Sequence, residues 1–182
     1  MLNPIDVRIK QVLNTMITAP APGAPELDAL FTQLSEAADQ RNRERAEQRI
    51  WEIWTDHEEA DAASAMRDAI AAFETGDAVA ADRALNMMVE RWPNWAEAWN
   101  KRTTLRFVEG RDADSLDDIA RTLELEPRHF GALGGFGQIC LRAGDIGSAL
   151  VAFEHAVAVN PNMDSIRQAA EALRRQDPRT IH

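Results

Sequence analysis

Cysteine is almost missing from this chain of 182 residues, in which Cys140 is the only one. A single cysteine cannot form an internal disulfide or build a metal site from several thiolates. Tyrosine is absent altogether, and only two lysines are present. No apolar run approaches the roughly 20 residues that a membrane-spanning helix needs. These absences argue against disulfide-rich, cysteine-cluster and integral membrane proteins.

Positive charge is also in short supply. Thirty acidic and twenty basic side chains give a formal net charge of −10, which argues against a nucleic-acid binder because such proteins neutralise phosphates. The hydrophobic share of 45% and the charged share of 27% are those of an ordinary globular protein and exclude wholesale disorder. Plentiful alanine and arginine beside scarce lysine are typical of a GC-rich bacterial genome.

Glycine and proline are few, but they recur at a fixed interval. Both follow a step of 34 residues, at Pro93, Pro127 and Pro161 and at Gly76, Gly110 and Gly144. A constant period of this length is the signature of a repeat architecture. The length of the chain suits one domain or a short repeat array.

The last unit shows how each repeat is built. Its small and apolar residues have the i, i+3, i+4, i+7, i+8 spacing of a helix with one buried stripe, at Leu133, Phe136, Gly137, Cys140 and Leu141. Gly144 can take the left-handed conformation that ends a helix, and Asp145 can cap the next helix. That second helix ends before Pro161, because the residue before a proline is disfavoured in the helical region. Two short helices cannot bury both faces alone, so we expect neighbouring units to stack.

This pattern resembles the tetratricopeptide repeat (TPR), a 34-residue helix–turn–helix with small residues at positions 8, 20 and 27 and proline at position 32. Counted from Phe130, the last unit matches the family pattern at Leu133, Gly137, Ala149, Phe153, Ala156 and Pro161. The unit from Ala96 opens with Trp99, but Ser115 and Thr122 replace its small apolar residues. The resemblance implies an all-α, TPR-type α-solenoid, a right-handed superhelix of helix–turn–helix repeats. It places the repeats at residues 62–95, 96–129 and 130–163, with a capping helix and tail at 164–182.

The segments before the repeats are less regular. Residues 1–18 predict an amphipathic helix that starts at Asn3-Pro4, and residues 19–25 predict an extended proline-rich linker. Residues 26–61 are interpreted as a degenerate TPR-like helix pair, in which Phe31 and Trp51 occupy family positions. The one-sided N-terminal helix has no partner of its own, so we expect it to fold back onto the array or onto a second copy.

The N-terminal helix does not have the pattern of a secretory signal. Charged Asp6, Arg8 and Lys10 stand where an apolar segment should begin. We therefore expect a cytoplasmic protein. A periplasmic location is the alternative, if an upstream or atypical signal exists.

Candidate catalytic and metal-binding residues have simpler explanations. Cys140 falls on the buried stripe of its helix, where a cysteine acts as a small hydrophobe and its pKa rises, opposite to what a nucleophile needs. The histidines lack the spacing of metal ligands, at His57, His129, His155 and His182. The glycine-rich stretch 134–137 lies inside a helix without a following Lys-Ser/Thr, so it is not a phosphate loop. We therefore expect that the protein is not an enzyme and that it holds neither a cofactor nor a metal ion.

The resemblance also implies where a partner would bind, because the first helix of each repeat lines a concave groove in this family. Family positions 2, 5, 9, 12 and 13 face that groove. In this sequence the groove-facing residues are Met66, Ile70, Phe73, Glu97, Asn100, Thr104, Phe107, Gly131, Gly134, Gln138, Leu141 and Arg142. A partly apolar groove suits an amphipathic helix or an extended hydrophobic segment.

Some family members clamp the C-terminal carboxylate of a chaperone with lysines, arginines and asparagines. Here Asn100 and Lys101 are the only hints of such a clamp, and Met66 and Ile70 stand where it needs polar groups. This partner is therefore disfavoured.

Two functions are consistent with these observations. The first is a non-enzymatic adaptor or scaffold that binds a peptide or amphipathic helix of another protein in the groove. The alternative is a self-associating structural module, a homodimer formed through the N-terminal helix or through Trp92 and Trp95. These tryptophans flank Pro93 at a repeat junction, where we expect only partial burial, and exposed tryptophan is a common interface anchor.

Overall fold

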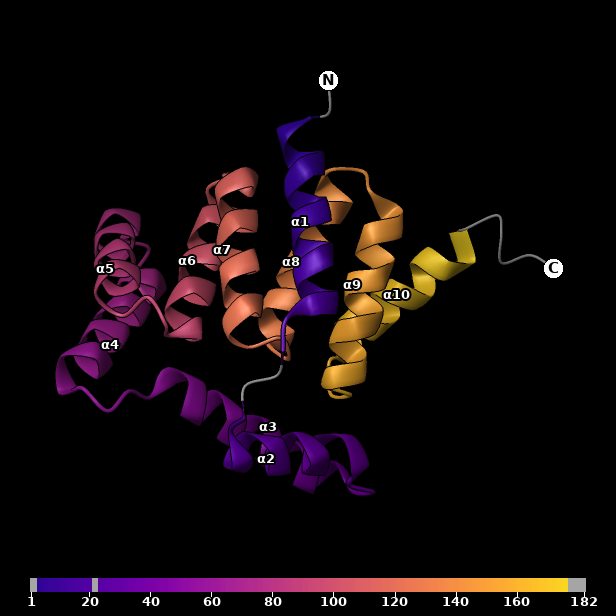
Figure 1. Ribbon diagram of the computed structural model, residues 1–182, viewed down its shortest axis with the longest axis horizontal. Helices are drawn as coiled ribbons and strands as arrows, with labels where there is room; N and C mark the ends of the chain where they lie inside the picture. Colours follow the sequence, from indigo (N-terminus) through magenta and orange to yellow (C-terminus); the bar gives the residue numbers. More distant parts are fainter. Residues whose placement is uncertain (1–2, 21–22, 177–182) are drawn as a thin grey trace. The chain divides into compact units, whose positions relative to one another are not determined.

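The computed structural model describes residues 3–20 and 23–176 and, within them, contains ten α-helices and no strand (Figure 1). The helices are α1 (Pro4–Thr18), α2 (Pro25–Glu36), α3 (Gln40–Thr55), α4 (Ala60–Glu74), α5 (Ala78–Arg91), α6 (Ala96–Val108), α7 (Asp112–Leu125), α8 (Phe130–Arg142), α9 (Ile146–Val159) and α10 (Asp164–Gln176). Each of the three expected repeats contains a helix pair, α4–α5, α6–α7 and α8–α9. None of the helices in the described ranges is long and apolar enough to cross a bilayer.

The helices form two compact units. The first comprises Met1–Pro22 and Ile50–Pro127, and the second comprises Gly23–Arg49 and Arg128–His182. The first unit therefore holds α1, the end of α3 and the four helices α4 to α7. The second holds α2, most of α3 and the helices α8 to α10.

In the first unit, α4 packs on α5, α5 on α6, and α6 on α7. Small side chains on α4 and α5 let the helices approach, and larger ones fill the space between them. The buried cluster of this unit consists of Ala62, Ala65, Met66, Ala69, Ala81, Leu85, Met88, Val89, Trp92, Trp95, Ala98 and Leu105.

The turns inside the repeats have the predicted chemistry. The left-handed conformation expected at three glycines is confirmed, with φ values of 75°, 73° and 79° at Gly76, Gly110 and Gly144. A side chain at these positions would be strained, because only glycine adopts this region freely. The predicted cap of α9 is also confirmed, since Asp145 accepts a hydrogen bond of 3.0 Å from the backbone N–H of Ser148.

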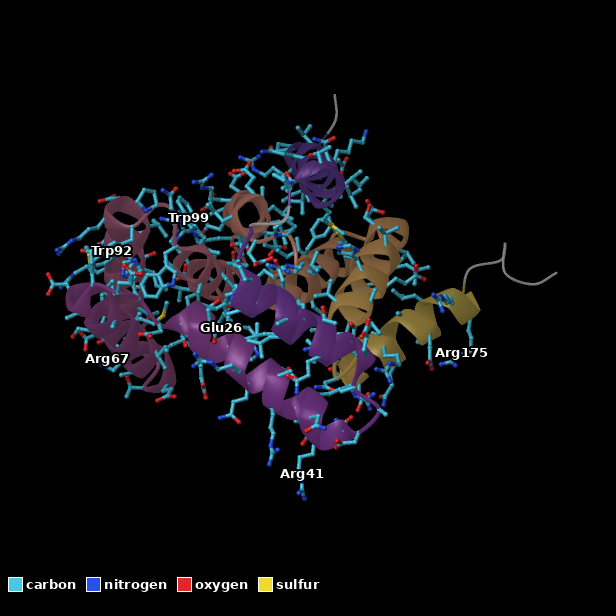
Figure 2. The ribbon with its side chains drawn as sticks, turned by 60° about the horizontal axis from the view of Figure 1, so that its bottom comes forward. Glu26, Arg41, Arg67, Trp92, Trp99 and Arg175 are labelled. Carbon is cyan, nitrogen blue, oxygen red and sulfur yellow. The ribbon has the colours of Figure 1, made fainter. Side chains whose placement is uncertain are left out.

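In the second unit, α8 packs on α9 and α9 on α10. Ala170 and Leu173 of α10 are buried, whereas Arg174 and Arg175 are exposed, and Figure 2 labels Arg175 near the end of this helix. An apolar stripe on one side and charges on the other suit a helix that closes a repeat array. The tail expected beyond it, with His182, lies outside the described residues.

Polar contacts attach α2 and α3 within the second unit. The carboxylate of Glu47 accepts hydrogen bonds from the side-chain amides of Asn160, at 3.0 Å, and Asn162, at 2.8 Å. Asp28 of α2 pairs with Arg128, which precedes α8, at 2.6 Å. The two helices expected in residues 26–61 are thus present, and their interpretation as a degenerate repeat stays a prediction.

The N-terminal helix folds back, as the sequence suggested. Asn3 caps α1 by accepting a hydrogen bond of 3.1 Å from the N–H of Ile5. In the first unit α1 packs along α7, the second helix of its repeat (Figure 1). One expected boundary is wrong: α2 begins at Pro25, which was assigned to the linker, because proline is well accommodated in the first turn of a helix. Residues 21–22 of that linker lie outside the description.

Candidate binding groove

An apolar cleft opens between the first helices of two successive repeats in the first unit. It has a volume of about 270 Å³. Its lining comes from α4, α5 and α6 and consists of Ala69, Ile70, Phe73, Glu74, Leu85, Lys101 and Thr104. Phe73 is 40% exposed at its rim, whereas Ala69 and Leu85 are buried. The cleft therefore offers an apolar floor that a partner side chain can reach.

Three residues predicted from the sequence line this cleft together: Ile70 and Phe73 of α4 and Thr104 of α6. Sequence reasoning missed Ala69 and Leu85 as lining residues, because both have the spacing of ordinary packing positions. Lys101 was considered only as a fragment of a carboxylate clamp.

The polar residues of α6 near the cleft satisfy one another. The carboxylate of Glu97 is fully buried and lies 2.8 Å from the Lys101 ammonium. The Asn100 side-chain amide donates a hydrogen bond of 2.9 Å to the same carboxylate. The ammonium also lies 5.7 Å from the centre of the Trp51 ring, in a cation–π arrangement. The charge of Lys101 is therefore largely compensated within the protein.

Four of the expected groove residues are not available at the surface, which corrects the prediction for them. Met66 belongs to the buried cluster of the first unit, and Glu97 and Asn100 are buried in the polar group just described. Gly134 is covered in the second unit, because a Cβ at this glycine would lie 3.3 Å from the Met163 side chain. The small residue lets the chain at the start of α10 approach α8 closely.

The remaining expected residues are accessible to different degrees. Thr104, Gln138 and Arg142 are exposed, and Phe107 is half-buried. On α8, Gly131 and Leu141 are also half-buried.

Trp92 and Trp95 form an internal aromatic cluster, so the expectation that they are only partly buried is wrong. They are 6% and 8% exposed, and their rings meet edge to face with centres 6.5 Å apart. The His57 ring packs against both, with its centre 4.8 Å from that of Trp95. The indole N–H of Trp95 donates a hydrogen bond of 2.7 Å to the carbonyl of Trp54. Figure 2 labels Trp92 and the separate, half-buried Trp99.

The thiol of Cys140 is deeply buried in the second unit. Burial, and to a lesser degree the charge of Asp145, raises the pKa of this thiol to about 12. Burial also lowers the pKa of the half-buried His155. A thiol in this setting is almost entirely protonated at neutral pH and is a poor nucleophile. Among the residues of the described ranges, no three His, Cys, Asp or Glu side chains lie close enough to hold a metal ion.

The raised pKa predicts that the thiol of Cys140 reacts slowly with disulfide reagents. Its pKa of about 12 compares with an ordinary value of 9.0, so at pH 8 the folded protein should react with a disulfide reagent roughly 1,000-fold more slowly than the unfolded chain. The same shift predicts that the contribution of Cys140 to stability is complete below about pH 9 and declines as the pH rises toward 12. Reaction rates with and without denaturant measure the first effect. Equal rates would show that the thiol is accessible and contradict this assignment.

Stacked helix pairs with a cleft between successive first helices define a class of helical repeat protein that presents a surface for interaction with other proteins. No family model matches the sequence. A TPR repeat-containing protein of Rhizobium etli is 34% identical over 152 residues, which cover 84% of this chain and 74% of that protein. The chain therefore belongs to the TPR repeat-containing proteins, and its fold is the all-α, TPR-type α-solenoid that the sequence predicted.

The structural comparison agrees with this fold. The TPR2B domain of yeast Sti1, solved in its pHsp70 complex, matches with a TM-score of 0.59 and 18% sequence identity. The match covers 65% of this chain and 99% of that domain. At this level of identity the likeness shows a shared fold.

Proposed function

We propose that this protein is an interaction adaptor that binds an apolar peptide segment or amphipathic helix of another protein in the cleft between α4 and α6. The observation that carries the proposal is the cleft itself, which exposes Phe73 above a buried apolar floor. A volume of about 270 Å³ suits one or two bulky apolar side chains. Grooves of this kind bind amphipathic helices through anchor residues that repeat with the helical period.

The chemistry of the cleft supports an apolar partner more than an anionic one. The structurally similar Sti1 domain forms a pHsp70 complex. In this chain, Lys101 is the only cation that lines the described cleft, and it already pairs with the buried Glu97. A carboxylate bound there would have to compete with that pair. Binding should therefore depend mainly on apolar contacts and only weakly on salt.

Self-association has less support, because both surfaces named for it are used within the chain. Trp92 and Trp95 are buried. The aliphatic residues Ile9 and Val12 of α1 are buried as well, in the helix that packs along α7 of its own chain. The groove thus remains the better-supported surface for an interaction.

A charge placed in the cleft should weaken binding selectively. We expect Phe73→Asp to reduce the affinity for peptides selected from a displayed library against the wild-type protein by at least tenfold, or about 1.4 kcal/mol, because it replaces the exposed aromatic side chain of the cleft with a charge that an apolar contact would have to desolvate. Fluorescence anisotropy of each labelled peptide measures the affinity, and circular dichroism checks the fold.

Val79→Asp is the matched control, because it introduces the same charge on α5. Val79 is 71% exposed and lies outside the cleft. This variant should bind the selected peptides like the wild type. Peptides that bind equally well to the folded Phe73→Asp protein would show that the cleft is not the binding site.

A further inference from the structure

The contact between α1 and α7 has the form of a helix bound to a helical surface. Ile9, Val12 and Thr15 of α1 are buried at a spacing of three residues. The guanidinium of Arg8 pairs with the carboxylate of Asp117 on α7 at 2.8 Å. An aliphatic stripe with a cation beside it is thus laid along an acidic helix.

The outer face of α7, defined by Ala113, Asp117 and Ala120, carries smaller side chains beside its carboxylate than the same face of α5 in the preceding repeat. Ala113 and Ala120 lie one helical turn on either side of Asp117, so all three share a face. The equivalent positions of α5, 34 residues earlier, hold Val79 and Asn86. Two alanines leave room for another helix backbone to approach closely.

The exposed carboxylate of Asp117 suits this face to a basic ligand. The exposed acidic residues on this face are Asp117 and Glu124, and the half-buried Asp114 beside them pairs with Arg111 at 2.8 Å. The only basic residue of α7 is Arg121, which pairs with Glu124 at 3.1 Å. The charged residues of α1 that follow Asp6 are Arg8 and Lys10. Opposite charges on two such surfaces favour their encounter and fix their register.

α1 packs mainly on one helix, α7. A free helix of 15 residues is only marginally stable in water, so α1 depends on its contacts to stay helical. Its fully buried aliphatic residues are Ile9 and Val12, and its Arg8–Asp117 pair is partly solvent-exposed. A terminal helix that is held mainly by one neighbour can open locally while the rest of the domain stays folded.

We propose that the outer face of α7 is a second protein-binding surface, and that its external ligand is a basic amphipathic helix of another protein that displaces α1. Such a helix would carry aliphatic residues at the spacing of Ile9 and Val12 and a cation to pair with Asp117. This surface is separate from the cleft residues of α4 and α6, so the inference does not depend on the groove.

A peptide with the sequence of residues 3–19 is a suitable probe, because it has the required chemistry. It should bind saturably to full-length protein that carries Ile9→Asp and Val12→Asp, since the substitutions detach the protein's own α1. The wild-type protein should bind it at least tenfold more weakly, because its tethered helix competes at a high effective concentration. Val7→Asp with Ile17→Asp changes residues of α1 that are exposed, and this control should behave like the wild type.

Charge reversal tests the ligand chemistry. An Arg8→Asp peptide should bind the detached variant at least threefold more weakly, and Asp117→Arg in that variant should restore its binding. Hydrogen exchange of the wild-type protein gives a second readout that needs no detached variant. Excess peptide should speed exchange in α1 while α7 stays protected.

Three results would overturn the proposal. Equal binding of the peptide to the wild-type and detached proteins would show that α1 does not cover the site. No change in α1 exchange with excess peptide would show that the helix is not displaced. A concentration-dependent dimer of the wild-type protein that is lost with Ile9→Asp and Val12→Asp would assign the face to a second copy instead.

Discussion

Replacement of Asp118 by alanine is expected to lower the free energy of unfolding by about 3–5 kcal/mol. The Asp118 side chain is 2% exposed and joins α7 to α6. Its carboxylate accepts two hydrogen bonds from Arg102, at 2.8 and 2.9 Å, and lies 2.7 Å from Arg106. Both guanidiniums are almost buried. Without the carboxylate they would be two neighbouring, mostly buried cations that have lost their shared anionic partner.

The expected loss comes from the orphaned arginines more than from a favourable ion pair. Burial raises the pKa of Asp118, although the Arg102 and Arg106 charges act in the opposite direction. Burial also lowers the pKa of Arg106. The three charges are therefore costly to bury, and each depends on the others.

Urea unfolding of Asp118→Ala and Asp117→Ala measures the effect. Asp117 is the neighbouring residue, but its side chain is 48% exposed and pairs with Arg8 at the surface. Loss of an exposed pair of this kind costs at most about 1 kcal/mol. Similar losses for the two variants would mean that the buried network does not hold α6 and α7 together.

Replacement of Gly137 by alanine is the second change with a large expected effect, a destabilisation of about 1–3 kcal/mol. A Cβ at this position would lie 2.2 Å from one carbon of the Phe153 ring and 2.4 Å from another. Phe153 is fully buried, so the ring cannot move aside without disturbing its neighbours. This clash outweighs the usual preference of a helix for alanine over glycine, which is about 1 kcal/mol.

Gly135→Ala provides an internal control in the same helix. A Cβ at Gly135 meets nothing within 4 Å. This variant should have a free energy of unfolding about 0.5–1 kcal/mol higher than the wild type, because alanine loses less conformational entropy than glycine when a helix forms. The melting temperatures of the two variants should therefore shift in opposite directions. A stabilised Gly137→Ala protein would contradict the close packing of α8 on α9.

The repeat period made most of the fold predictable. A 34-residue spacing of glycine and proline located the three helix pairs, and the left-handed glycines and the Asp145 cap follow from local backbone chemistry. These features depend on residues that are close in sequence. The helix paired with α1 was not predictable, because a one-sided apolar stripe shows that a helix needs a partner without saying which one.

The candidate site was predicted only in part for a similar reason. Family positions identified Ile70, Phe73 and Thr104, which line the cleft. They could not show that Glu97 would be buried with Lys101, or that Met163 would cover Gly134. The Glu97–Lys101 pair lies within α6, but the burial of Glu97 and the cover over Gly134 depend on how neighbouring helices rotate and pack against each other. Helical periodicity marks the buried side of one helix but does not fix that rotation.

Backbone amide chemical-shift changes on adding a peptide selected against the wild-type protein show whether the cleft between α4 and α6 binds a partner segment. The largest changes should cluster around Ile70, Phe73 and Thr104, and Phe73→Asp should greatly reduce them at the same peptide concentration. Changes centred on the exposed faces of α5 or α9, with the cleft residues unmoved, would contradict binding in the cleft.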